Sequence, residues 1–163
     1  MDWPHLHVLF NHVPIIGVPI AFVLMVWGLN RGSRDLARAA AAGAVIFGVA
    51  GFGAAQAGER AADRLEGAKV TWLNKDAVEE HEDRAETAEW VGLAAAALAV
   101  VLLWMSRGGR SVPVPVGWGV AGLLAIASVL FAWTALAGGA IRHDEFLRGG
   151  VAPPAVERAT SER

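Results

Sequence analysis

The longest uncharged run of the chain, VPVPVGWGVAGLLAIASVLFAWTALAGGAI over residues 112–141, decides the fold class. A transmembrane helix needs about 20 mostly apolar residues, and this run exceeds that length. Three further runs of the same character cover residues 13–29, 39–57 and 90–105. Four such runs in 163 residues leave too little polar surface for a soluble domain. The sequence therefore predicts an all-α, four-helix transmembrane bundle with spans at about 8–29, 39–57, 86–105 and 114–140.

The composition agrees with a membrane protein. Apolar residues make up 55% of the chain and charged residues only 18%, whereas soluble domains average about 25% charged. The absence of cysteine excludes a disulfide scaffold, a zinc finger and thiol redox chemistry. A net charge of -2 argues against nucleic acid as a partner. We expect one folded domain over residues 1–148, without internal repeat, and a disordered Pro- and charge-rich tail over 149–163.

Basic residues predict the orientation in the membrane. Arg31, Arg34 and Arg38 lie between the first two spans, and Arg107 and Arg110 lie between the last two. Short loops rich in Arg and Lys face the cytoplasm. We therefore expect a multi-pass protein of the bacterial inner membrane, in contact with the lipid bilayer, with both termini and the acidic segment 58–89 on the periplasmic side.

All five histidines lie at the ends of spans on that same side. They are His5, His7, His12, His81 and His143. Asn11 followed by Pro14 predicts that the first helix is capped at Asn11, which places His12 in its first turn. His5 and His7 precede this predicted start and are the weakest candidates. His81 begins a stripe of small residues at helical spacing, which predicts that it faces the bundle interior.

Imidazoles and carboxylates at one mouth of a bundle are typical ligands of a transition metal ion. The predicted ligands are His12, Glu59, His81 and His143. The residues expected to surround and orient them are Asn11, Asp63, Glu82, Arg142 and Glu145. This arrangement predicts a redox or metal-handling centre that faces the periplasm.

Three alternatives stay open from the residues alone. The first is a heme b electron-transfer protein in which two of the histidines bind the iron and Arg142 pairs with a propionate. The second is a pH-sensing or proton-handling cluster of His and Glu side chains. The third is a structural or assembly subunit without a cofactor. No charged residue lies inside the four apolar runs, which argues against a channel or transporter, and enzymatic activity is left open.

Four short motifs resemble a group of bacterial four-span membrane proteins, the "domain of unknown function 2231" type. They are NHVP at 11–14, GERA at 58–61, HEDRA at 81–85 and GGAIRHDE at 138–145. The resemblance covers about residues 5 to 145, and each motif falls at the end of a span.

The resemblance implies functional roles for five positions, which are His12, Glu59, His81, His143 and Glu145. Proline is frequent in this type between the last His and Glu, where this chain has Asp144. Some proteins of the type carry c-type cytochrome domains. A periplasmic cytochrome or another redox membrane subunit is therefore the implied partner.

Overall fold

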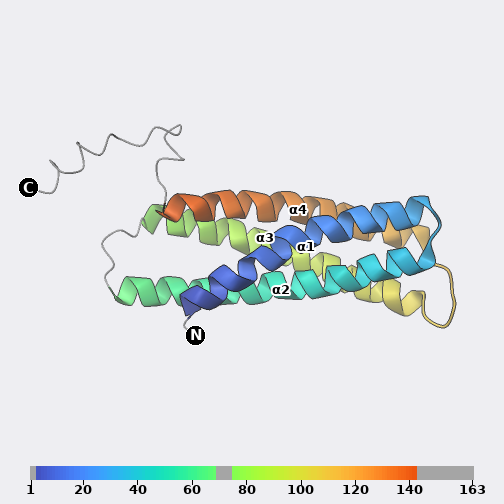
Figure 1. Ribbon diagram of the computed structural model, residues 1–163, viewed down its shortest axis with the longest axis horizontal. Helices are drawn as coiled ribbons and strands as arrows, with labels where there is room; N and C mark the ends of the chain where they lie inside the picture. The colour runs from blue at the N-terminus through green and yellow to red at the C-terminus, as the bar shows by residue number, and fades with distance from the viewer. Residues whose placement is uncertain (1–2, 69–74, 143–163) are drawn as a thin grey trace, which may run out of the picture.

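The computed structural model describes residues 3–68 and 75–142, and this part of the chain contains helices and no strand. The four helices are α1 (Trp3–Asn30), α2 (Arg34–Gly67), α3 (Lys75–Met105) and α4 (Val114–Arg142). They run up and down as two hairpins, α1–α2 and α3–α4, which pack into one bundle (Figure 1). The prediction of an all-α four-helix bundle is confirmed. The predicted tail at 149–163 lies outside the described residues.

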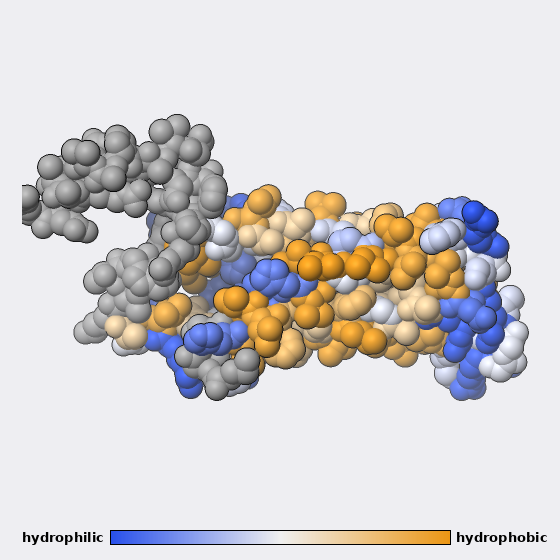
Figure 2. Space-filling model, in the orientation of Figure 1, coloured by the Kyte–Doolittle hydropathy of each residue, from blue (hydrophilic) through white to orange (hydrophobic). Residues whose placement is uncertain are grey.

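Each helix contains a stretch long and apolar enough to cross a membrane. A band of hydrophobic side chains covers the middle of the bundle, and hydrophilic side chains gather at the end that holds the α1–α2 and α3–α4 connections (Figure 2). This distribution is that of a multi-pass membrane protein. The lipid-facing surface includes large exposed side chains such as Val129 and Leu136, which are 69% and 74% exposed within the bundle.

Arginines of α2 close the end of the bundle that holds the two short connections. The Arg38 guanidinium donates hydrogen bonds to Leu103 O (3.1 Å) and Ser106 Oγ (2.7 Å). Arg34 donates to Ser106 O (3.1 Å) and to Arg110 O (2.8 Å). These carbonyls lie at the C-terminal end of α3 and just beyond it, where helical partners are missing and a positive charge is favourable. We call this part of the bundle the arginine end.

A tight turn at Gly32 and Ser33 connects α1 to α2. Gly32 adopts a φ of 60°, a left-handed conformation that glycine reaches without steric cost. Its N–H donates to Leu29 O (3.2 Å), and the N–H of Ser33 donates to Gly28 O (2.9 Å). The Ser33 hydroxyl then accepts a hydrogen bond from Leu36 N and caps α2.

Small side chains form the centre of the bundle. Buried alanines and glycines recur along α2, and α3 presents a matching set that includes Ala95 and Ala99. The closest approach is between Gly48 and Gly92, because a Cβ atom on Gly48 would lie 2.6 Å from Gly92 O. Such contacts between small residues allow helices to pack tightly in a membrane.

Helix α1 begins earlier than the sequence predicts. It starts at Trp3 and continues through Pro14 and Pro19, so Asn11 lies within the helix and is not its N-cap. Proline in a helix interior removes one backbone hydrogen bond, and packing against neighbouring helices can offset that loss in a membrane protein. Pro14 is fully buried. The two turns before Asn11 therefore carry His7 into the bundle.

We expect opposite effects from alanine at two glycines of α2. Gly48→Ala should lower the free energy of unfolding by about 1–3 kcal/mol, because the new methyl group meets the α3 backbone. Gly53→Ala is the matched control, since no atom lies within 4 Å of the added Cβ, and it should be neutral or stabilising. Thermal unfolding in detergent, followed by tryptophan fluorescence, measures both. Equal effects would contradict the close approach of α2 and α3.

Candidate functional site

The end of the bundle opposite the arginine end contains a cavity of about 640 Å³. Pockets that bury a cofactor-sized molecule have volumes of about 300–1,000 Å³. All four helices line it, and most of its wall is apolar and made of small residues, among them Gly51, Ala54 and Ala85. Phe131 of α4 lines the cavity and also lies against Gly51 and Gly92.

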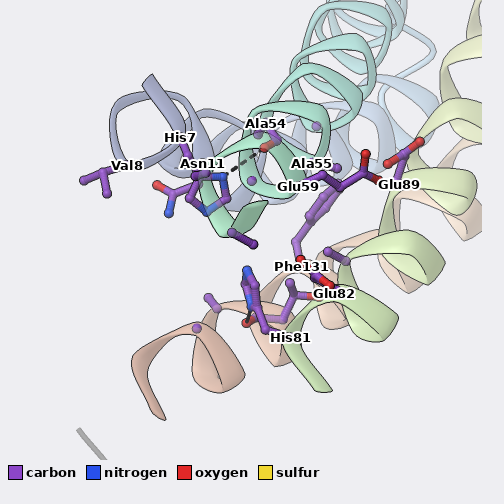
Figure 3. Close-up of a pocket in the computed structure, with 18 of the residues that line it drawn as sticks. His7, Val8, Asn11, Ala54, Ala55, Glu59, His81, Glu82, Glu89 and Phe131 are labelled. Atoms are coloured by element: carbon purple, nitrogen blue, oxygen red, sulfur yellow. Dashed lines mark hydrogen bonds between the residues drawn. The ribbon is translucent and has the colours of Figure 1, made fainter. Parts of the chain in front are cut away.

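His7 enters the cavity from α1 and is held by the neighbouring helix α2. Its Nδ1 lies 2.9 Å from Ala54 O (Figure 3). A carbonyl oxygen only accepts hydrogen bonds, so Nδ1 carries the proton, and in the neutral ring Nε2 keeps a free lone pair. The guanidinium of Arg60 stacks over the Trp3 ring at 4.8 Å and ties the first turn of α1 to α2.

His81 enters the cavity from α3 and is held in the same way by α4. Its Nδ1 lies 3.0 Å from Thr134 O, so this nitrogen also donates and Nε2 is again free. The guanidinium of Arg84 stacks over the Trp133 ring at 4.3 Å and ties α3 to α4 near this point. The sequence prediction that His81 faces the bundle interior agrees with this position.

The two imidazoles face each other across the cavity (Figure 3). Their ring centroids are 6.1 Å apart, and their planes are nearly perpendicular at 87°. A metal ion bonded to both Nε2 atoms at about 2.0 Å would set the two centroids about 6 Å apart. The observed centroid spacing is close to this value. Each ring is oriented by a backbone carbonyl, and metal-binding histidines are often oriented in the same way.

A glycine makes room for each ring. A Cβ atom on Gly58 would lie 3.0 Å from Cε1 of His7, and one on Gly138 would lie 3.0 Å from Cε1 of His81. In each hairpin the glycine follows the carbonyl acceptor by four residues, since Gly58 follows Ala54 and Gly138 follows Thr134. The hairpins thus repeat one local geometry, although the sequence shows no repeat.

Most of the other predicted site residues that the structure describes also reach this cavity. Asn11, His12, Glu59 and Glu82 line it, whereas Asp63 is exposed and lies outside the lining. His12 is exposed, and its Nδ1 donates to Val8 O of its own helix (3.0 Å). His143 and Glu145 lie outside the described residues. Arg142 ends α4, and its side chain lies outside them too.

The predicted set of three histidines and a carboxylate stays a prediction, because its fourth member lies outside the described residues. Within residues 3–68 and 75–142, no three His, Asp or Glu side chains gather closely enough to hold a metal ion. Instead, His81 is paired with His7, which was the weakest candidate in the sequence. The signal that could have identified His7 is its spacing from Asn11 and Pro14, which places all three on one face of a longer helix.

Asn11 supplies an independent sign that the cavity takes a ligand. Its Oδ1 is buried and has no hydrogen-bond partner, and the residue lines the cavity one turn from His7. Buried polar atoms without a partner are rare in folded proteins and usually indicate a bound molecule or water. Rotation of the amide about the Cβ–Cγ bond would instead direct its NH₂ group, a donor for carboxylates, toward the same space.

The arrangement can bind a group that offers open positions to two imidazoles on opposite sides. A structural zinc ion takes four protein ligands, whereas the described residues bring only two imidazoles together here. A planar tetradentate group supplies the missing ligands itself.

Comparison with known proteins does not assign a family or a function to this chain. The chain matches no protein-family model, no curated protein and no solved structure. The resemblance to the "domain of unknown function 2231" type therefore stays a prediction that rests on the four quoted motifs.

Proposed function

We propose that this chain is a membrane-embedded electron-transfer protein that holds one heme b between His7 and His81. The observation that carries the proposal is the pair of facing imidazoles, 6.1 Å apart at their centroids, each with Nδ1 on a backbone carbonyl. Heme supplies one-electron redox chemistry when bound, and paired histidines are suitable axial ligands. The chain has no cysteine, so a covalent c-type attachment has no anchor.

The cavity supports a porphyrin-sized occupant for two further reasons. Its wall is apolar around the rings, which suits the faces and edges of a planar aromatic group. Small residues such as Ala55, Ala62 and Gly139 leave space where larger side chains would fill it. Asn11 is the described group best placed to bind a polar substituent of the cofactor.

A transition metal ion bound by His12, Glu59, His81 and His143 is the second candidate. The observation in its favour is that His12, Glu59 and His81 all line the cavity, each from a different helix. The two proposals assign different roles to Glu59. A carboxylate ligand is essential to the ion, whereas the heme site depends on His7 and His81 alone for its axial ligands.

We propose that the cavity faces the periplasm. The support is the gathering of five arginines at the opposite end, namely Arg31, Arg34, Arg38, Arg107 and Arg110. A periplasmic electron carrier, such as a cytochrome, or another redox membrane subunit would then reach the centre from the open mouth of the bundle.

The heme proposal predicts a Soret band in the protein purified in detergent, which shifts and sharpens when dithionite is added. His7→Ala and His81→Ala should each abolish or strongly weaken the band, because each removes an axial ligand. His12→Ala is the matched control on α1 and should keep it, since that ring is exposed and bonded to its own helix. Unchanged helix content by circular dichroism would show that the variants fold.

A wild-type protein that shows no Soret band, even after hemin is added, would overturn the heme proposal. Elemental analysis of the same sample, with Glu59→Ala as the discriminating variant, would then test the metal-ion proposal. A bound metal that depends on both Glu59 and His81 would support that centre.

Two glycines of α4 test the position of the ring. Gly138→Ala should lower the ratio of Soret to protein absorbance, because the added Cβ presses on the His81 imidazole. Gly122→Ala lies outside the cavity lining and should leave the ratio unchanged, since no atom lies within 4 Å of its added Cβ. An unaltered ratio in Gly138→Ala would argue against a cofactor that depends on the observed position of His81.

The orientation can be tested with single cysteines, because the chain has none of its own. Glu79→Cys near the cavity end should react with a membrane-impermeant maleimide in intact spheroplasts. Ser111→Cys at the arginine end should react only after permeabilisation. Both positions are exposed, so a difference in labelling reports on the side of the membrane. The reverse pattern would place the cavity on the cytoplasmic side.

A further inference from the structure

Glu89 is the one charged residue that is buried in the described part of the chain. The residue is 7% exposed, and it lines the cavity from α3 (Figure 3). It lies eight residues beyond His81, which is about 12 Å further along the helix toward the bundle centre. Glu89 therefore sits at the deep end of the space in which the cofactor is proposed to bind.

The carboxyl group of Glu89 has no partner of opposite charge. Within the described residues it forms no ion pair or hydrogen bond, and the charged groups whose fields reach it are the carboxylates of Glu59 and Glu86. Burial of an ionised carboxyl group without a counter-charge is costly, and nearby negative charge raises that cost.

Three of the four helices contribute titratable side chains to the cavity lining. These side chains are His7 and His12 on α1, Glu59 on α2, and His81, Glu82, Glu86 and Glu89 on α3, whereas the described part of α4 contributes Thr134, which is not titratable in this range. Of the carboxylates, only Glu89 is buried, and Glu86 lies about one turn nearer the mouth and is exposed.

We propose that Glu89 is the proton acceptor of the redox centre, an inference that rests on the proposed function. On one-electron reduction of a cofactor held by His7 and His81, the Glu89 carboxylate would take one proton from a hydronium ion of the solvent, which leaves a water molecule. An O–H bond forms on the carboxylate, and on oxidation the same proton is released. The added electron and the added proton leave the net charge of the buried site unchanged, which lowers the electrostatic cost of reduction.

The test is the pH dependence of the midpoint potential of the full-length protein, measured by spectroelectrochemistry from mildly acidic to mildly alkaline pH. Reduction with proton uptake makes the potential fall as pH rises. The limiting slope for one proton per electron corresponds to a tenfold change in equilibrium per pH unit, or about 59 mV. Glu89→Gln keeps the shape of the side chain but cannot ionise, so it should flatten the slope. Glu86→Gln is the matched control on the same wall and should keep it.

A second measurement reports on the carboxyl group itself. Infrared difference spectra between the reduced and oxidised protein should show a protonated-carboxyl C=O band on reduction. The band should be absent in Glu89→Gln and present in Glu86→Gln. This signature would not respond to a merely structural change in the cavity.

The outcomes separate the two proposals. A Soret band that persists in Glu89→Gln, together with a slope equal to that of the wild type, would overturn the role of Glu89 and leave the heme proposal intact. A slope lost equally in Glu86→Gln would assign proton uptake to the acidic wall and also overturn the specific role of Glu89. Absence of a Soret band in the wild type would overturn the proposed function itself.

Discussion

Two hydrogen bonds from imidazole to a helix carbonyl organise the open half of this bundle. Inside a helix, the carbonyl of residue i points toward residue i+4, so a side chain at i+4 hides it from neighbouring helices. Gly58 and Gly138 remove that side chain above the carbonyls of Ala54 and Thr134. The rings of the adjacent helices can therefore reach those oxygens, which fixes both the tautomer and the direction of the free Nε2.

The packing of the four helices fixes the positions of these two hydrogen bonds relative to each other. His7 and His81 lie on α1 and α3, which occupy opposite corners of the bundle because each packs mainly against α2 and α4. Each hairpin positions one ring, and the packing of the hairpins against each other sets the distance between the rings. The close approach of Gly48 and Gly92 is one of the tight contacts between the hairpins. Packing near the bundle centre thus sets the geometry at its mouth.

The sequence predicted the fold well and the site in part. The four apolar runs predicted the helices, and the two arginine-rich loops predicted the arginine end. Both features could be predicted because lipid imposes a strong and local requirement on composition. The structure places His81, Asn11, His12, Glu59 and Glu82 in the lining of one cavity, and their role as ligands or neighbours of a cofactor stays a prediction.

The pairing of the imidazoles could not be predicted in the same way. His7 was underestimated because Asn11 and Pro14 imitate a helix start, whereas packing carries α1 back to Trp3. The glycine and carbonyl that receive each ring lie on another helix, and only the tertiary structure shows that contact. Glu89 borders an apolar run in sequence, and its burial depends on the shape of the cavity.

The arginine end has a consequence for how the protein is made. The hydrogen bonds from Arg34 and Arg38 to the end of α3, and the alanine-rich packing beside them, involve none of the residues that line the cavity. Half of the bundle can therefore assemble in the membrane without an occupant at the other end. If the proposed centre is filled by a cofactor, insertion of the polypeptide and binding of that cofactor would be separable in time, because the contacts at the arginine end hold the helices together independently of the cavity.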